Sequence, residues 1–318
     1  MTLGTMRFAI ATLFAGFLAS TVQAQQIGTV ETQEATTSTA EAQQNAWQSF
    51  IAVSAAYQGK GDLDSGGDFS ISGVGLRGGT SGPVGSGTRA GVTLTYIYSD
   101  YSFSDPVAFG GVAPWSTVQR FGVAVPLSFA LGNGWGLGVI PSVDWFKENG
   151  AKTDDSLAWG AIVSGSKRFD DGNMIGLGVG VYDRIEQTAV FPFLLIDWRL
   201  SERWRVINPL AAGPTGPAGV EFDYHFDRGW TAGVGAAWRI QRFRLSESGS
   251  TPDGIGEERG APVFLRVTRE FGQQMALHLY AGVVAAGELR LENSSGNTLV
   301  KEDFDPAPFI ALSFMARF

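Results

Sequence analysis

From Trp47 onward, apolar residues recur at every second position along most of the chain. The C-terminal segment is the clearest example, because one parity carries Ile310, Leu312, Phe314 and Phe318, whereas Ser313 and Arg317 lie on the other. Alternation with a period of two indicates β-strands with one apolar face. The pattern predicts about fourteen strands, near residues 47–58, 67–77, 87–102, 116–131, 135–147, 157–169, 174–184, 189–200, 203–208, 219–226, 230–245, 261–271, 275–292 and 306–318. The segments 67–77 and 203–208 alternate least clearly, so twelve strands remain an alternative.

A soluble β-sandwich also alternates, but two features favour a membrane barrel over a sandwich. The segments run to about ten to sixteen residues, whereas strands of globular proteins usually have about five or six. Short connectors such as 132–134 and 227–229 also alternate with longer polar ones such as 103–115, 184–189, 246–260 and 293–305. Short turns on one rim and long loops on the other are typical of outer-membrane barrels. The connector 78–86 is an exception, because it lies on the short-turn side and is long.

Aromatic residues mark the ends of the predicted strands. Trp135 and Trp145 lie on one face of the same strand. At a rise of ~3.3 Å per residue and a tilt of ~40°, their separation corresponds to about 25 Å, the height of the apolar band of such barrels. Aromatic side chains filling a soluble core would not sit so regularly beside turns. The predicted aromatic girdle comprises Trp47, Trp135, Trp145, Trp198, Trp204 and Trp230. We therefore expect an all-β protein, a transmembrane antiparallel up-and-down β-barrel.

The N-terminal segment 1–24 is typical of a secretory signal peptide. Arg7 is its only charge, an apolar run follows, and Val22-Gln23-Ala24 offers a cleavage site after Ala24. A membrane anchor helix is the alternative, but the run is shorter than the ~20 residues that a span needs. Residues 25–46 hold few large apolar groups and are predicted to form a disordered periplasmic lead-in to a barrel over 47–318.

The C-terminal strand also suggests a cellular location. A last strand with alternating apolar residues that include Phe314 and ends on Phe318 resembles the assembly signal of bacterial outer-membrane β-barrel proteins. The resemblance implies a Gram-negative, diderm bacterium and insertion by the barrel-assembly machinery, with outer-membrane lipid and lipopolysaccharide as the surroundings. The stretch "NPLAAGPTGPAG" (208–219) resembles a Pro/Gly motif of an uncharacterised family of outer-membrane barrels, a domain of unknown function. That second resemblance implies no activity.

The composition of the chain limits its chemistry. The formal net charge is −8, which argues against nucleic acid as a partner. The chain has two His and no Cys, so we predict no metal site and no cofactor. Some barrel enzymes hydrolyse or transfer lipid acyl chains with a Ser/His pair. His225 and His278 are predicted to point into the lumen, and a lipid hydrolase or acyltransferase is the less favoured alternative to a protein without catalytic residues.

Strand parity also places a group of polar side chains inside the predicted barrel. These lumen candidates are Asp197, Arg199, Arg203, Arg205, Glu221, Asp223, His225 and Arg239. They could form a salt-bridge network that stiffens the wall, or a mixed-charge constriction that orients a small polar solute. We therefore expect a porin-like, passive or narrow-specificity channel for small polar solutes. The alternative is a closed barrel with a structural or surface-interaction role.

Overall fold

The computed structural model describes residues 46–211 and 213–318. The predicted signal peptide and nearly all of the predicted lead-in lie outside the described residues. The strands are β1 (Gln48–Asp62), β2 (Asp68–Gly85), β3 (Thr88–Ser104), β4 (Thr117–Ala124), β5 (Leu127–Gly132), β6 (Trp135–Glu148), β7 (Leu157–Arg168), β8 (Met174–Arg184), β9 (Gln187–Arg199), β10 (Trp204–Ile207), β11 (Gly219–Phe226), β12 (Trp230–Ala237), β13 (Arg239–Arg244), β14 (Ile255–Phe271), β15 (Met275–Glu292), β16 (Thr298–Phe304) and β17 (Ala307–Arg317). Two short 3-10 helices, η1 (Val107–Phe109) and η2 (Asp154–Ser156), lie in loops. No helix in the described part of the chain is long and apolar enough to cross a membrane.

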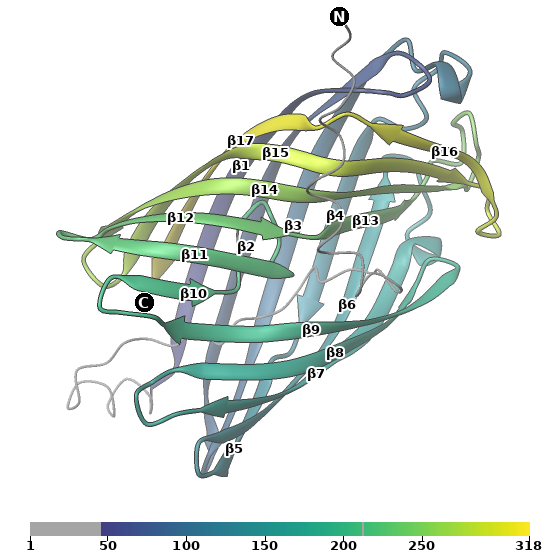
Figure 1. Ribbon diagram of the computed structural model, residues 1–318. Coiled ribbons are helices and arrows are strands. Elements are labelled where there is room, and N and C mark those ends of the chain that lie inside the picture. Colours follow the sequence, from purple (N-terminus) through teal and green to yellow (C-terminus); the bar gives the residue numbers. More distant parts are fainter. Residues whose placement is uncertain (1–45, 212) are drawn as a thin grey trace, which may run out of the picture.

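The strands form one closed antiparallel barrel (Figure 1). Three strands are each interrupted once, between β4 and β5 at Pro126, between β12 and β13 at Trp238, and between β16 and β17 at Pro306. Proline lacks the N–H that a strand interior needs, which explains two of these breaks. The two parts of each broken strand have at least one neighbour in common (β3 and β6, β14, and β15, respectively), so the barrel has 14 strands, and the predicted fold class is confirmed.

Pairing of the first and last strands closes the barrel. β1 and β17 are antiparallel, with Val53 opposite Phe314. At the end of the chain, Ser49 N–H donates to the Phe318 carbonyl at 2.9 Å, and Phe318 N–H donates to the Ser49 carbonyl at 3.0 Å. The terminal aromatic residue is therefore hydrogen-bonded into the wall, and the sheet has no free edge at this seam.

The outer face of the barrel is apolar. Side chains such as Val53, Leu177 and Leu265 lie on it and are 48%, 70% and 61% exposed. A soluble monomer rarely exposes apolar surface of this extent, whereas lipid covers it in a membrane barrel. Among the six predicted girdle residues, Trp47, Trp135, Trp204 and Trp230 are exposed, Trp145 stacks on Phe121, and Trp198 packs edge-on against Phe169.

Some strands continue further than the sequence pattern predicted. β2 runs to Gly85, so the connector 78–86 is mostly strand and the turn to β3 is short, which removes the exception noted above. At the opposite rim, β8 and β9 are joined through Ile185 and Glu186 alone, so the long connector predicted over 184–189 is wrong. β14 begins at Ile255 and β16 covers Thr298–Phe304, in stretches predicted as polar loops. Their charged side chains pair across strands, which stabilises these polar extensions.

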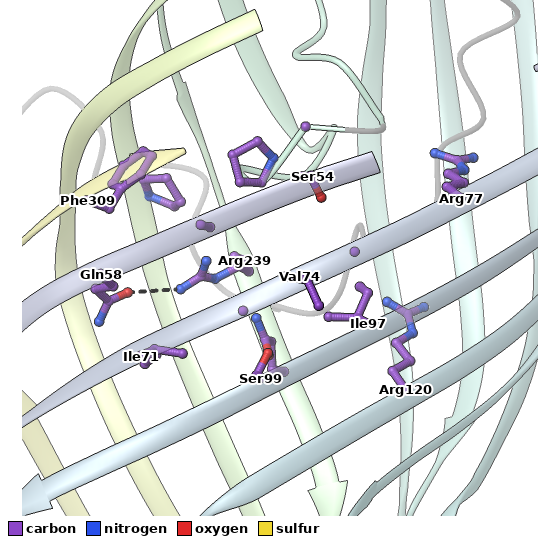
Figure 2. Close-up of a pocket in the computed structure, with 18 of the residues that line it drawn as sticks. Ser54, Gln58, Ile71, Val74, Arg77, Ile97, Ser99, Arg120, Arg239 and Phe309 are labelled. Carbon is purple, nitrogen blue, oxygen red and sulfur yellow. Dashed lines mark hydrogen bonds between the residues drawn. The ribbon is translucent and has the colours of Figure 1, made fainter. Parts of the chain in front are cut away.

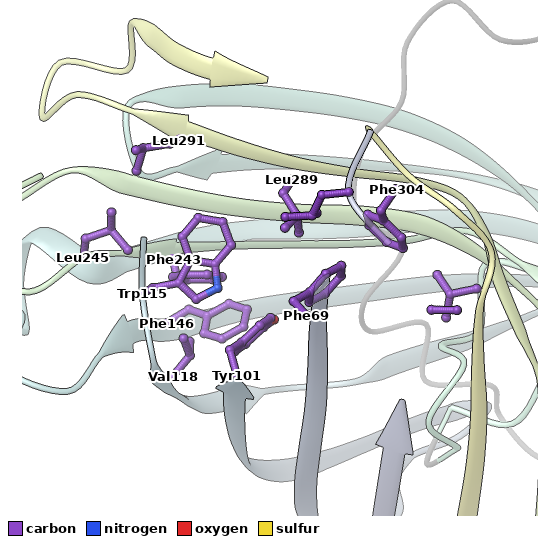
Figure 3. Packing of buried hydrophobic residues seen from close by; sticks show 13 residues of the cluster. Phe69, Tyr101, Trp115, Val118, Phe146, Phe243, Leu245, Leu289, Leu291 and Phe304 are labelled. Carbon is purple, nitrogen blue, oxygen red and sulfur yellow. The ribbon is translucent and has the colours of Figure 1, made fainter. Parts of the chain in front are cut away.

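A buried apolar cluster lies at the rim of the long loops (Figure 3). Phe243 of β13 lies between residues of the opposite wall, with ring centroids 5.3 Å from Trp115 and 5.6 Å from Phe146 of β6. β12 lies across the ring from β6, whereas β13, which continues β12 after Trp238, pairs in parallel with β6 through Arg244 and Lys147, so the chain crosses the mouth of the barrel here. The cluster comprises Leu63, Phe69, Tyr101, Trp115, Val118, Phe146, Phe243, Leu245, Val284, Leu289, Leu291, Phe304 and Ala307. We call it the apolar plug.

Candidate functional site: the barrel lumen

The short-turn half of the lumen contains a buried ion cluster. Arg266 of β14 donates from Nε to Glu221 Oε1 at 2.6 Å and from Nη2 to Asp223 Oδ2 at 2.7 Å. Both acids belong to β11, and β12 lies between β11 and β14. Gly233 of β12 is in register with Asp223 on one side and Arg266 on the other. A Cβ at Gly233 would collide with carboxylate oxygens of both acids, so glycine here lets the arginine reach across the intervening strand.

Three further ion pairs line the lumen. Arg205 binds Asp197 with two hydrogen bonds, 2.7 Å from Nε and 2.8 Å from Nη2. Arg120 Nε donates to Asp144 Oδ1 at 2.9 Å. In the third, Glu258 accepts from two groups: Arg239 Nη2 donates to its Oε1 at 2.6 Å and the Tyr101 hydroxyl donates to its Oε2 at 2.7 Å. Such charge-assisted bonds hold guanidinium groups in fixed positions on the lumen wall.

The structure brings some of the eight lumen candidates together and separates others. Glu221, Asp223 and Asp197 are buried, and Arg205 and Arg239 are half-buried in the ion pairs just described. His225 shares a hydrogen bond of 3.1 Å with the Thr231 hydroxyl. The exposed Arg203 lies at the rim, where its guanidinium donates to the Tyr224 hydroxyl at 3.1 Å. Arg199 is also exposed, at the end of β9.

Sequence analysis missed several charged residues of the lumen. Arg266 alternates with the outward Leu265 and Val267, so strand parity alone would have placed it inside. The same argument applies to Arg120 and Asp144. These residues lie outside the consecutive strands β9–β11, and Arg266 reaches the acids of β11 only across β12.

The Pro/Gly segment that follows β10 runs into the lumen, and its described residues are 208–211 and 213–218. The Asn208 side chain anchors its start, because Nδ2 donates to the carbonyls of Leu194 at 2.9 Å and Gly219 at 3.0 Å. A Cβ at Gly213 would lie 2.6 Å from the hydroxyl of Tyr280, a buried residue of β15. The segment therefore extends from β10 into the lumen as far as β15, and we call it the inward segment.

A cavity of about 170 Å³ lies between the inward segment and the wall formed by β1, β2 and β3 (Figure 2). Its cations are Arg77, Arg120 and Arg239, and no Asp or Glu among the residues that the structure describes lines it. Gln58, Ser54 and Ser99 add polar groups, while Ile71, Ile97, Val284 and Phe309 add apolar surface. Pro214 of the inward segment forms part of the opposite side. The cavity combines positive charge with an apolar body.

At the long-loop rim, the strand extensions carry a second ion network. Arg242 of β13 donates to Glu292 at 2.7 Å and to Glu257 at 3.3 Å. On β16, Lys301 points outward, so this stretch lies beyond the apolar band. Its ammonium group lies 2.9 Å from Glu288, and the hydrogen bond to that carboxylate raises the pKa of Lys301.

The surroundings of the two histidines and of the acidic side chains are relevant to catalysis and to metal binding. His278 Nδ1 lies 2.8 Å from the Thr268 hydroxyl, and His225 pairs with Thr231, so each histidine has a threonine rather than a serine as its hydroxyl partner. Within residues 46–211 and 213–318, no group of three or more His, Cys, Asp or Glu side chains is arranged to hold a metal ion.

Comparison with known proteins finds similar barrels at low sequence identity. No protein-family model matches the chain, and no curated protein matches it. An outer-membrane channel from Pseudomonas putida F1 has 10% identity and a TM-score of 0.47, over 86% of this chain and 96% of that one. The toluene transporter TodX of P. putida has 9% identity and a TM-score of 0.40, over 86% and 90%. The translocator domain of the autotransporter NalP from Neisseria meningitidis has 13% identity and a TM-score of 0.36, over 86% and 89%. At these sequence identities and TM-scores, the similarity gives no information about which solute this chain would transport.

Proposed function

We propose that the protein is a narrow channel of the bacterial outer membrane that admits small polar solutes through its lumen. The observation that carries this proposal is the cationic cavity between the inward segment and the β1–β3 wall. Eight-stranded barrels are filled by their own side chains, and barrels of sixteen or more strands leave a water-filled channel. A barrel of 14 strands lies between these cases, so an inward segment can set its bore.

Three features support this location: the outer surface, the terminal strand and the N-terminal sequence pattern. The apolar outer face and its aromatic rims suit a bilayer. The hydrogen-bonded terminal strand resembles a barrel-assembly signal, and the signal-peptide pattern accounts for export. In this proposal the short turns face the periplasm and the long loops face the cell exterior.

A closed barrel with a structural or surface-interaction role is the second candidate, because the apolar plug lies across the lumen. Conductance in a planar lipid bilayer separates the two functions. We expect small, discrete conductance steps from the purified protein. Replacing Ala211–Pro217 with a short Gly-Ser linker should enlarge them, and replacing the exterior loop residues Ser248–Thr251 with the same linker is the control. If neither the wild type nor the variant lacking Ala211–Pro217 shows conductance, although both are correctly folded, the channel is excluded.

A further inference from the structure

We infer that the cavity is a binding site for a small carboxylate with a compact apolar body. The inference rests on the proposed function in placing the site on the solute path. It goes further by naming the chemical class of the solute.

Two hydrogen-bond donors of the cavity wall are buried and have no partner. They are Nε2 of Gln58 and Nε of Arg239. Gln58 is 5% exposed, and its Oε1 accepts from Arg239 Nη2 at 3.3 Å, so the amide and the guanidinium lie side by side (Figure 2). Buried donors without acceptors cost free energy, and paired donors are the rule in native proteins. A ligand with acceptor oxygens at this edge of the cavity would satisfy both once the Gln58 amide and the Arg239 guanidinium turn toward it.

The charge around these donors selects an anion. The cavity lining includes three guanidinium groups and no carboxylate. Asp144 and Glu258, which pair with Arg120 and Arg239, are not among the lining residues. Guanidinium and amide N–H groups match the planar, two-oxygen geometry of a carboxylate. A cationic solute would find no carboxylate among the described residues that line the cavity.

The remainder of the cavity determines the size and polarity of the rest of the ligand. Ile71, Val284 and Phe309 contribute apolar surface near the Gln58–Arg239 pair. The volume of about 170 Å³ resembles that of an engineered apolar cavity of about 150 Å³ that holds one benzene molecule. Benzoate, a benzene ring with one carboxylate, is therefore a suitable probe.

The test titrates the purified full-length barrel in detergent with benzoate, benzamide and benzylammonium, and measures heat by calorimetry. Benzamide has the same shape without the charge, and benzylammonium carries the opposite charge. We expect benzoate to bind at least tenfold more tightly than either. Gln58→Leu should weaken benzoate binding at least fivefold. Gln119→Leu, the same change on the outer face of β4, should leave the benzoate affinity unchanged.

A second variant keeps the test decisive if Gln58→Leu fails to fold. Gln58→Glu retains an acceptor for Arg239 and places a negative charge in the cavity, so it should abolish benzoate binding in a folded barrel. Equal affinity for benzoate and benzamide, or unchanged benzoate affinity in a folded Gln58 variant, would overturn the inference. Bilayer conductance without benzoate binding refutes the inference and leaves the channel intact. Benzoate binding without conductance supports the site and refutes the channel.

Discussion

Arg266 offers the sharpest test of the lumen geometry. Replacing it with Met removes the partner of both Glu221 and Asp223, which are 0% and 3% exposed. Removing one member of a buried ion pair costs about 3–5 kcal/mol, because a charge remains buried without compensation. Here two carboxylates are affected, so we expect Arg266→Met to lower the free energy of unfolding by an amount at the upper end of that range.

The triple variant Arg266→Met, Glu221→Gln and Asp223→Asn shows whether the cost comes from uncompensated charge. Neutral replacement of a whole buried network is often close to neutral, so the triple variant should recover most of the stability. Arg203→Met is the matched control, since its side chain is 57% exposed and such pairs contribute about 1 kcal/mol or less. The assay is urea unfolding of the barrel in lipid vesicles, followed by tryptophan fluorescence. Equal stability of the Arg266 single variant and the wild type would refute the assignment.

Four further outcomes are expected. Val234→Arg, on the lipid-facing side of β12, should cost about 2–4 kcal/mol and reduce insertion in vesicle-folding assays. Deleting Phe318 removes both hydrogen bonds to Ser49 and should lower the amount of heat-modifiable barrel in the outer-membrane fraction. Arg205→Gln leaves Asp197 without its bidentate partner, so ion selectivity in bilayers should shift toward cations, an effect that added salt should reduce. Arg244→Ala removes the ion pair with Glu186 and three hydrogen bonds to backbone carbonyls at the long-loop rim, so it should lower stability and raise the conductance of the barrels that fold.

The barrel could be predicted from the sequence because lipid imposes a strict pattern. In strands such as β6 and β17, each outward residue contacts lipid and each inward one the lumen, so alternation indicates the environment directly. The extensions of β14 and β16 were missed because Glu257 and Glu258 are adjacent and Lys301, Glu302 and Asp303 form a charged run. These runs lie beyond the apolar band, where both faces of a strand can carry charge.

The lumen was less accessible to sequence reasoning. Parity indicates which side chains point inward, but the partner of each depends on the order of strands around the ring and on what lies between them. Arg266 reaches Glu221 only because Gly233 leaves the space above β12 open. The course of residues 208–218 was not predictable either, since a Pro/Gly-rich segment excludes regular strand without indicating whether it folds outward or inward.

The contacts across the mouth of the barrel are apolar on one side and polar on the other, and this difference indicates where a solute can pass. The apolar plug includes residues of β2–β4, β6, β13 and β15–β17 but none of β7–β12. Opening it would expose several aromatic side chains, each worth about 1.5–3 kcal/mol when buried. On the side of β8 and β9, the rim is joined to β13 by polar contacts, such as Arg242 donating to the Ile185 carbonyl at 2.9 Å and Arg244 to Glu186 at 3.0 Å. Hydrogen bonds to charged groups contribute about 1.5–3 kcal/mol each, but water or a polar solute can take over the partners of such bonds, whereas water offers no substitute for a lost apolar contact. A solute is therefore expected to enter at the β8–β9 side of the long-loop rim and to reach the cavity beside the inward segment from there.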